Sequence, residues 1–219
     1  MKRLLILGSG GHSKVVSETA LCCGYRDFVY LDDRATLMDV HLAKSSSNVP
    51  EGPLDYALTS NYISSFQDAI VAIGDPFVRF NWIRNLLNVG YNLPILVHSS
   101  ASVSPSALLG IGSVVFANCS IQASVRAGQG SIFNTSCSVD HDCELGTCVH
   151  IAPGARLAGS VFIGDLSLVG IGSCIVPNVK VGSQAVVGAG SVVLSDVPSN
   201  STVAGVPARL LSSSRRHTL

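Results

Sequence analysis

From Gly110 to Val193 the sequence divides into fourteen blocks of six residues without a gap. The sixth residue of each block is apolar, and the fourth is always Ser, Cys, Val or Ala. On an α-helix a step of six rotates a side chain by about 240°, so no apolar stripe would form. On a strand six is an even step, so places four and six face the same way. Fourteen blocks exceed any single strand, and the pattern therefore predicts a parallel β-helix of short strands joined by turns.

The composition excludes several classes of function. Formal net charge is zero and charged residues make up 13% of the chain. The chain therefore has no excess of positive charge that would favour binding to nucleic acid or to an anionic membrane. The apolar run after the basic start "MKR" has only four residues, too few for a signal peptide. Seven cysteines form an odd set without framework spacing. We expect a cytoplasmic protein with free thiols and no inserted membrane segment.

The first half of the chain predicts a small βαβ unit. "RLLILGSGGHS" is an apolar run and a glycine turn, followed by a stretch with helical spacing. "FVYLDD" (28–33) indicates a second strand ending in acids, and 69–87 indicates strand, turn and helix. The loop is similar to G-x-G-x-x-G, but Ser13 replaces the third glycine. The unit is too short for a dinucleotide domain, so a nucleotide-sugar fits better than NAD; a glycine turn needed only for packing is the alternative.

The blocks and the closing "AGVPAR" resemble the hexapeptide-repeat acyltransferases, whose left-handed β-helix has eighteen residues per coil. The whole chain resembles bacterial sugar acyltransferases of the sialic-acid O-acetyltransferase and UDP-4-amino-sugar N-acetyltransferase type. The matching stretches include "GSGGHSKVV", "AIGDPFVR" and "NTSCSVDHDCELGTCVHIAPGARLAG". The resemblance implies an α/β plus all-β chain, with a Rossmann-like nucleotide-sugar-binding domain at 1–92 and a left-handed β-helix acyltransferase domain at 93–219. It also implies acetyl-CoA as co-substrate and no metal.

With eighteen residues per coil, the repeat assigns outward faces. Place five points outward and holds charged residues such as Arg126, Glu144, Arg156 and Lys180. Along one face the same place forms a mostly apolar stripe of Val114, Ile132, His150, Leu168 and Val186. An outward apolar stripe is typical of an interface, and the resembled superfamily is trimeric, so we expect a homotrimer.

The segment "SVDHDCELG" (138–146) gathers three ionisable groups in the least charged half of the chain. His141 falls in a turn, where its ring can be exposed, and a histidine can take a proton near neutral pH. A neighbouring carboxylate would orient the ring and raise its basicity. The resemblance implies that His141 is the catalytic base and Asp142 its partner, whereas Asp140 has a solvated-turn interpretation. A surface turn histidine without catalytic function is the alternative.

The resemblance also implies the contacts of acetyl-CoA. His150 would donate a hydrogen bond to the thioester carbonyl; the alternative is a packed interface histidine. The coenzyme would run along a column of turn positions eighteen apart, Ile171, Ala189 and Pro207, and Gly159 would offer a backbone amide. By register, His141 and His150 lie on opposite sides of a coil, so we expect them to meet only across a subunit boundary.

The remaining contacts implied by the resemblance concern the acceptor. The glycine loop, the two acids and the turn near residue 74 would bind the nucleotide-sugar, and the amide of the "NTS" stretch would lie beside the acceptor group. Arg79 matches an arginine of the family, without an assigned role. The acceptor-site residues that the resemblance implies are Gly10, Gly11, His12, Asp32, Asp33, Gly74 and Asn134.

Together these features predict direct acetyl transfer from acetyl-CoA to a UDP-4-amino-4,6-dideoxy sugar. O-acetylation of sialic acid or another sugar hydroxyl is one alternative, and a non-catalytic nucleotide-sugar-binding trimer is another. A zinc site of His141, Cys143, Cys148 and His150 has suitable ligand types. Cys143 stands at an inward place four while His150 points outward, which argues against zinc and against cysteine nucleophile catalysis.

Overall fold

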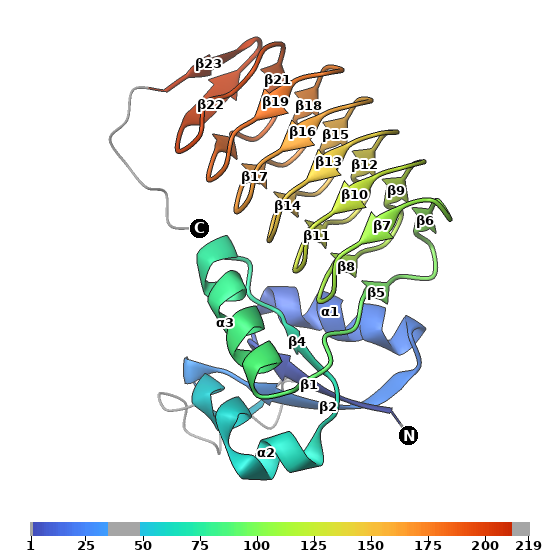
Figure 1. The fold of residues 1–219 in the computed structure, drawn as a ribbon, viewed down its shortest axis with the longest axis vertical. Helices are drawn as coiled ribbons and strands as arrows, with labels where there is room; N and C mark the ends of the chain where they lie inside the picture. Colours follow the sequence, from blue (N-terminus) through green and yellow to red (C-terminus); the bar gives the residue numbers. More distant parts are fainter. Residues whose placement is uncertain (1, 35–48, 212–219) are drawn as a thin grey trace.

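The computed structural model describes residues 2–34 and 49–211. Its N-terminal part is a parallel sheet in the order β3-β2-β1-β4, which Figure 1 shows at the end of the molecule opposite β23. The strands are β1 (Lys2–Leu7), β2 (Tyr25–Leu31), β3 (Pro50–Gly52) and β4 (Ala69–Val71). The helices are α1 (Gly11–Cys22), η3 (Leu54–Leu58), α2 (Ser60–Ser65) and α3 (Pro76–Asn88). The predicted strand–turn–helix order is confirmed.

Strand β1 lies in the centre of this sheet and is covered on both faces. Its residues Leu4, Leu5, Ile6 and Leu7 have no exposed surface, as expected of a parallel strand between helical layers. The chain leaves β1 at Gly8, whose φ is +106° and where a Cβ would lie 2.7 Å from the carbonyl oxygen of Ala72. Glycine is therefore required at the turn that leads from β1 into α1.

The second part is a left-handed parallel β-helix, as predicted. From residue 96 to residue 193 each strand is followed by a turn to the next face, and every third strand joins the same sheet; Ile132 pairs with His150, eighteen residues later. The last two strands form an antiparallel hairpin at the end of the eight-stranded sheet. The eight-stranded sheet contains β5 (Leu96–Val97), β8 (Val114–Val115), β11 (Ile132–Phe133), β14 (His150–Ile151), β17 (Leu168–Val169), β20 (Val186–Val187), β22 (Thr202–Gly205) and β23 (Ala208–Leu210). The six-stranded sheet contains β6 (Ser102–Val103), β9 (Ser120–Ile121), β12 (Ser138–Val139), β15 (Arg156–Leu157), β18 (Cys174–Ile175) and β21 (Val192–Val193). The five-stranded sheet contains β7 (Leu108–Leu109), β10 (Arg126–Ala127), β13 (Glu144–Leu145), β16 (Phe162–Ile163) and β19 (Lys180–Val181).

The interior of the β-helix follows the repeat. Residues at places four and six fill it, including Cys119, Phe133, Cys143 and Ile163, each at most 2% exposed. The place-five residues Arg126, Glu144, Arg156 and Lys180 are exposed, as predicted. All seven cysteines lie in the described residues and none forms a disulfide.

The corners of the β-helix depend on place three of each block. From Gly112 to Gly190 the third residue of every six-residue block has a positive φ, between 53° and 68°. These positions include Asp142 and Cys148 as well as glycine and asparagine. A single left-handed residue reverses the curvature of the chain, so each block can turn onto the next face.

The N-terminal part packs directly on the β-helix. Val114 and Ile132, 2% and 1% exposed, join a core cluster with Leu4, Ile6 and Val16 of the N-terminal part. The interpretation of the place-five stripe as an intersubunit interface is therefore wrong for Val114 and Ile132. Apolar side chains on the outside of the β-helix must be buried by another surface, and here the N-terminal part of the same chain buries them.

The predicted boundary between the two domains, at residues 92 and 93, falls shortly before β5. The predicted end of the β-helix domain, residue 219, lies outside the described residues. None of the helices in the described ranges combines the length and apolar character that a membrane crossing requires.

Candidate active site

His141 and Asp142 lie at the corner between β12 and β13, where the six-stranded sheet passes to the five-stranded sheet. His141 Nδ1 and Asp142 Oδ2 are 2.8 Å apart, and both side chains are more than half exposed, 58% and 60%. The hydrogen bond that His141 Nδ1 donates to Asp142 raises the pKa of His141, and the charge of Asp140 adds to the effect. Asp140 also accepts a hydrogen bond from the His141 amide at 2.8 Å. An exposed imidazole is thus held by its neighbour with Nε2 directed away from that carboxylate.

The ring of His141 packs against Gly159, one coil further along. A Cβ at residue 159 would lie 2.6 Å from Cε1 and 2.7 Å from Nε2 of the ring. Any larger side chain at this position would displace the imidazole. The backbone also links the two coils here, since Ser160 N donates to the His141 carbonyl oxygen at 2.9 Å.

His150 lies on the eight-stranded sheet, on the opposite side of the coil from the His141 corner. The repeat predicts an outward, exposed position for His150, and this prediction is wrong because its ring is mostly covered within the chain. Burial together with the charge of Arg79 lowers its pKa to about 3. Its Nε2 is 3.1 Å from Asn134 Nδ2, and Asn134 Oδ1 accepts from Thr135 N at 2.9 Å. Asn134 therefore donates to His150, which assigns the imidazole proton to Nδ1.

His12, at the start of α1, points toward the β-helix. Its ring meets Phe116 edge-on with 5.4 Å between centroids and lies 6.4 Å from the ring of His150. Burial, with the charge of Arg79, lowers its pKa to about 4, and its Nε2 is buried without a hydrogen-bond partner among the described residues. The side chain of His12 is therefore a neutral group in the seam between the two parts of the chain.

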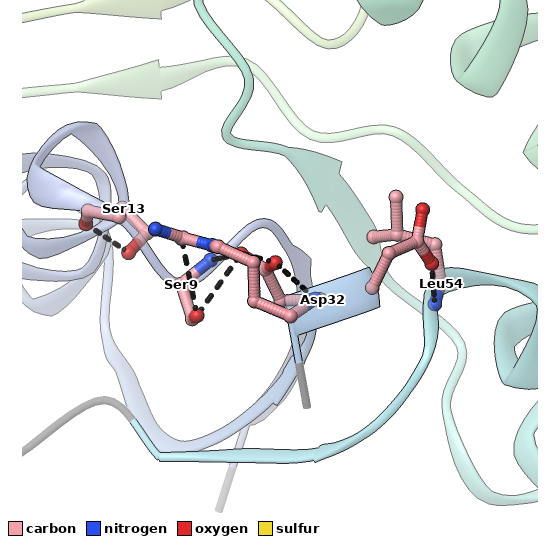
Figure 2. A network of polar contacts seen from close by, with 7 residues as sticks. Ser9, Ser13, Asp32 and Leu54 are labelled. Atoms are coloured by element: carbon pink, nitrogen blue, oxygen red, sulfur yellow. Dashed lines mark hydrogen bonds and ion pairs between the residues drawn. The ribbon is translucent and has the colours of Figure 1, made fainter. Parts of the chain in front are cut away.

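The glycine loop is held by Asp32, as Figure 2 shows. Asp32 Oδ2 accepts from Ser9 N at 2.7 Å and from Ser9 Oγ at 3.0 Å. Arg34 binds the same carboxylate through Nε at 2.9 Å, Nη2 at 2.7 Å and its backbone N–H at 3.0 Å. Arg34 holds the pKa of Asp32 well below its usual range. This carboxylate therefore already accepts five hydrogen bonds, and it shapes the loop.

The other predicted acceptor residues are arranged around this loop. Asp33 accepts a hydrogen bond from Leu54 N at 3.0 Å. Gly10 is the N-cap residue of α1 and has no side-chain cap; a Cβ there would lie 3.3 Å from Arg34 Nη2. Gly11, the first residue of α1, and Gly74 have open space where a Cβ would be.

Two residues of the predicted coenzyme column, Ile171 and Ala189, lie at the corner between the eight-stranded and six-stranded sheets, whereas Pro207 lies in the hairpin turn between β22 and β23. All three are exposed, Ile171 to 60%. The peptide bond before Pro207 is cis. Gly190 N donates to the Ile171 carbonyl oxygen at 2.7 Å, which links successive turns of the column.

The four residues of the zinc alternative do not converge. Cys143 and Cys148 are fully buried, whereas the side chain of His141 is 58% exposed. Within residues 2–34 and 49–211 no group of three or more His, Cys, Asp or Glu side chains could hold a metal ion.

Three residues around the site were not anticipated. Ser9 and Arg34 complete the Asp32 network, and Phe116 packs on His12. The position of Arg34 directly after the acid pair was an available signal, because an arginine two residues from an aspartate can fold back onto it. No corresponding signal pointed to Phe116, which is far from His12 in the sequence and meets it only in the folded chain.

Comparisons place this geometry among known proteins. The PglD N-terminal domain family matches residues 3–86. The acetyltransferase domain of PglB from Neisseria gonorrhoeae is 41% identical, with 96% of this chain and 100% of that chain covered and a TM-score of 0.88. Perosamine N-acetyltransferase from Caulobacter crescentus is 36% identical, with 97% and 98% covered and a TM-score of 0.88. WeeI from Acinetobacter baumannii is 26% identical, with 96% and 100% covered and a TM-score of 0.82.

The hexapeptide β-helix and these relatives define the chain as an acyltransferase. More narrowly, it belongs to the family of hexapeptide-repeat sugar acyltransferases whose N-terminal part is a PglD-type domain.

Proposed function

We propose that the protein transfers the acetyl group of acetyl-CoA to the amine of a nucleotide-linked amino sugar, with His141 as general base. The PglB acetyltransferase domain has been solved with acetyl coenzyme A, and the Caulobacter enzyme with CoA and GDP-perosamine. Seven unpaired thiols favour a reducing compartment, so we place the reaction in the cytoplasm.

The observation that carries this proposal is the His141–Asp142 pair. A general base must have a free nitrogen, a basicity matched to neutral pH and room for a substrate beside it. His141 meets these conditions: Asp142 occupies Nδ1, the pKa is raised and the ring is more than half exposed. The same arrangement orients Nε2 toward an incoming acceptor.

The chemistry is a direct transfer. The amine nitrogen attacks the thioester carbonyl carbon, His141 Nε2 removes a proton from that nitrogen, and the developing oxyanion is stabilised by hydrogen bonds. Collapse of the tetrahedral intermediate forms the C–N bond and breaks the C–S bond. The departing thiolate then takes the proton from His141, which returns the base to its neutral form.

His150 and Gly159 are the proposed donors to that oxyanion. A neutral His150 with its proton on Nδ1 can donate a hydrogen bond, and its low pKa keeps it neutral through the physiological range. Gly159, whose amide would be the second donor, packs against the ring of the proposed base. The coenzyme would extend from there along Ile171, Ala189 and Pro207.

The nucleotide-sugar would lie over the glycine loop, with its diphosphate at the uncapped N-terminus of α1. Gly10, Gly11 and the backbone amide of His12 would contact the phosphates, because the neutral His12 ring turns away into the seam. Asp33 and Gly74 would border the nucleoside, and Asn134 would lie beside the amine. We propose UDP as the nucleotide, and a GDP-linked sugar is favoured next by the Caulobacter complexes.

A homotrimer would complete this site. His141 and His150 lie on opposite sides of one coil, so a single chain cannot bring both to one substrate. In a three-fold assembly the corner of one subunit meets the face of the next. We therefore propose that each site combines His141 of one subunit with His150 and Asn134 of its neighbour.

Mass spectrometry tests the reaction directly. Acetyl-CoA is incubated with a UDP- or GDP-linked 4-amino-4,6-dideoxy sugar, and the nucleotide-sugar is examined for an added acetyl group. Product from the wild type, lost in His141→Ala, supports the reaction and the base. Hydroxyl acceptors such as sialic acid form the second arm, and product only there would move the assignment to O-acetylation. Binding of both ligands without any product would favour a non-catalytic trimer.

A further inference from the structure

Arg79 is the largest fully buried side chain in the described residues, with 1% of its surface exposed. It is the fourth residue of α3 and forms no ion pair within those residues. A buried guanidinium without a carboxylate must be stabilised by other acceptors, because removing a charge from water is costly. The hydrogen-bond acceptors of Arg79 identify the segments of the chain that this side chain connects.

The guanidinium donates to four backbone carbonyl oxygens from both parts of the chain. Nη1 donates to Ile73 at 2.9 Å and to Gly74 at 2.7 Å, in the turn between β4 and α3. Nε donates to Gly130 at 2.8 Å, and Nη2 donates to Cys148 at 2.6 Å. One side chain thus ties the turn proposed to border the nucleoside to two turns of the β-helix.

Those two turns lead directly to the proposed catalytic groups. Gly130 and Cys148 are eighteen residues apart, at the same corner of successive coils. Gly130 precedes β11, which ends one residue before Asn134, and Cys148 lies two residues before His150. Asn134 and His150 are themselves joined by a hydrogen bond. A shift of either turn would therefore move a group that faces the acceptor or the thioester.

We propose that Arg79 is a positioning residue for acetyl transfer, which fixes the nucleotide-sugar turn against Asn134 and His150 through its four carbonyl contacts. This inference rests on the proposed function, because it assigns the two groups their roles. In this proposed role Arg79 does not contact the substrate. Its effect would be on the alignment of the reacting atoms, where a displacement of about 1 Å can cost about 100-fold in rate.

The charge of Arg79 has a second consequence for the same groups. Four titratable groups interact with the guanidinium: His12, His150, the Cys148 thiol and Asp75. Burial together with the charge of Arg79 lowers the pKa of the two histidines. His12 also faces His150 and contributes to lowering the pKa of His150. Arg79 therefore helps to keep His150 in the neutral form that accepts from Asn134.

A lysine cannot reproduce this arrangement. The guanidinium is a planar fork whose N–H groups point in fixed directions, whereas an ammonium is a single centre with three donors. Arg79→Lys keeps the charge but cannot reach four carbonyls from two directions. Arg79→Gln removes the charge and keeps one amide donor group. The two variants therefore separate alignment from electrostatics.

Steady-state kinetics form the first test, with Arg84→Gln as the matched control, because Arg84 is an exposed arginine on the same helix. We expect kcat to fall about 10–100-fold in both Arg79 variants while KM for acetyl-CoA changes less than about 3-fold. The control should match the wild type. A folded Arg79→Gln protein with kcat within about 2-fold of wild type would overturn the proposal.

NMR titration of the imidazole groups provides a readout that requires no activity. The pKa of His150 should rise in Arg79→Gln and remain low in Arg79→Lys, whereas a purely structural residue would give the same result in both. An unchanged His150 titration in Arg79→Gln, or failure of both variants to fold, would reject the positioning role. Absence of wild-type activity on every acceptor would instead reject the proposed function, whatever the titrations show.

Discussion

Gly159 lies directly beneath the ring of His141, and a Cβ there would come within 2.6 Å of Cε1. The two residues are eighteen apart, so the β-helix itself brings the glycine under the proposed base. The imidazole is therefore positioned from two sides, by Asp142 along the chain and by Gly159 across the coils.

Replacement of Gly159 by alanine should displace the His141 ring. We expect kcat to fall about 10–100-fold, because the base loses alignment with the acceptor. The protein should remain folded, since only the exposed ring must move. Steady-state kinetics measure the change in kcat, and circular dichroism checks that the variant is folded. A crystal structure of the variant with the ring unmoved, and full activity, would contradict the proposed arrangement.

The hydrogen bond that the proposed base, His141, donates to Asp142 sets its pH dependence. His141 must be neutral to accept a proton, and Asp142 raises its pKa, so activity should fall as pH drops through that raised value. In Asp142→Asn the acid limb of the kcat profile should move to lower pH, and the plateau should fall about 10–100-fold. The wild type with the same acceptor is the reference, because titration of the acceptor amine is then common to both profiles. An acid limb that stays in place would separate Asp142 from the base.

The two covered histidines predict a loss of stability in acid. The pKa of His12 is lowered to about 4 and that of His150 to about 3, whereas both take up protons near pH 6.5 when unfolded. Above pH 6.5 both rings are neutral in the folded and the unfolded chain, so protonation costs no stability. As pH falls toward about 4, the unfolded chain takes up protons that the folded chain does not, and the free energy of unfolding declines. At pH 5 we expect a loss of about 2 kcal/mol for each ring, measured as the free energy of unfolding in urea.

His12→Phe provides the comparison for this acid effect. The His12 Nε2 has no hydrogen-bond partner among the described residues, and its ring packs on Phe116, so phenylalanine can replace the contact. About half of the dependence of stability on pH should disappear in the variant. An unchanged dependence would show that other groups cause it.

Asp32 should affect binding of the nucleotide-sugar more than turnover. Its carboxylate holds Ser9 of the glycine loop and Arg34 beside it, so Asp32→Ala releases both. We expect KM for the nucleotide-sugar to rise about 10–100-fold with kcat at saturation largely retained. Asp27→Ala is the matched control, because Asp27 forms an exposed ion pair with Arg3 on the neighbouring strand. Equal effects of the two substitutions would remove Asp32 from the site.

The sequence predicted the β-helix well because its repeat acts on every block. Places four and six must point inward for the coil to close, and Phe133 and Cys143 do so. The left-handed third place was not foreseen, although Asn and Gly recur there and favour that conformation. The His141–Asp142 contact was foreseen because the two residues are adjacent, so their meeting required no knowledge of the tertiary fold.

The contacts between the two parts of the chain were beyond sequence reasoning. An outward place five predicts exposure only when nothing covers it, and the N-terminal part covers Val114 and Ile132. Arg79 meets Gly130 and Cys148 across 51 and 69 residues, and no periodicity links these positions. Such contacts depend on how α3 docks against the corner, which is decided by packing rather than by the repeat.

A mixture of inactive variants tests whether each site is shared between subunits. His141→Ala lacks the proposed base and His150→Ala lacks the proposed oxyanion donor, so each should be inactive alone. If His141 acts with His150 of a neighbour, random mixed trimers would contain about a quarter of sites with both residues intact. Activity should therefore recover to about a quarter of wild type after the variants are unfolded and refolded together. If both residues belonged to one subunit, no mixed trimer would contain an intact site and the mixture would stay inactive. Light scattering on the same samples checks the trimer itself, and a stable monomer with full activity would reject the shared site.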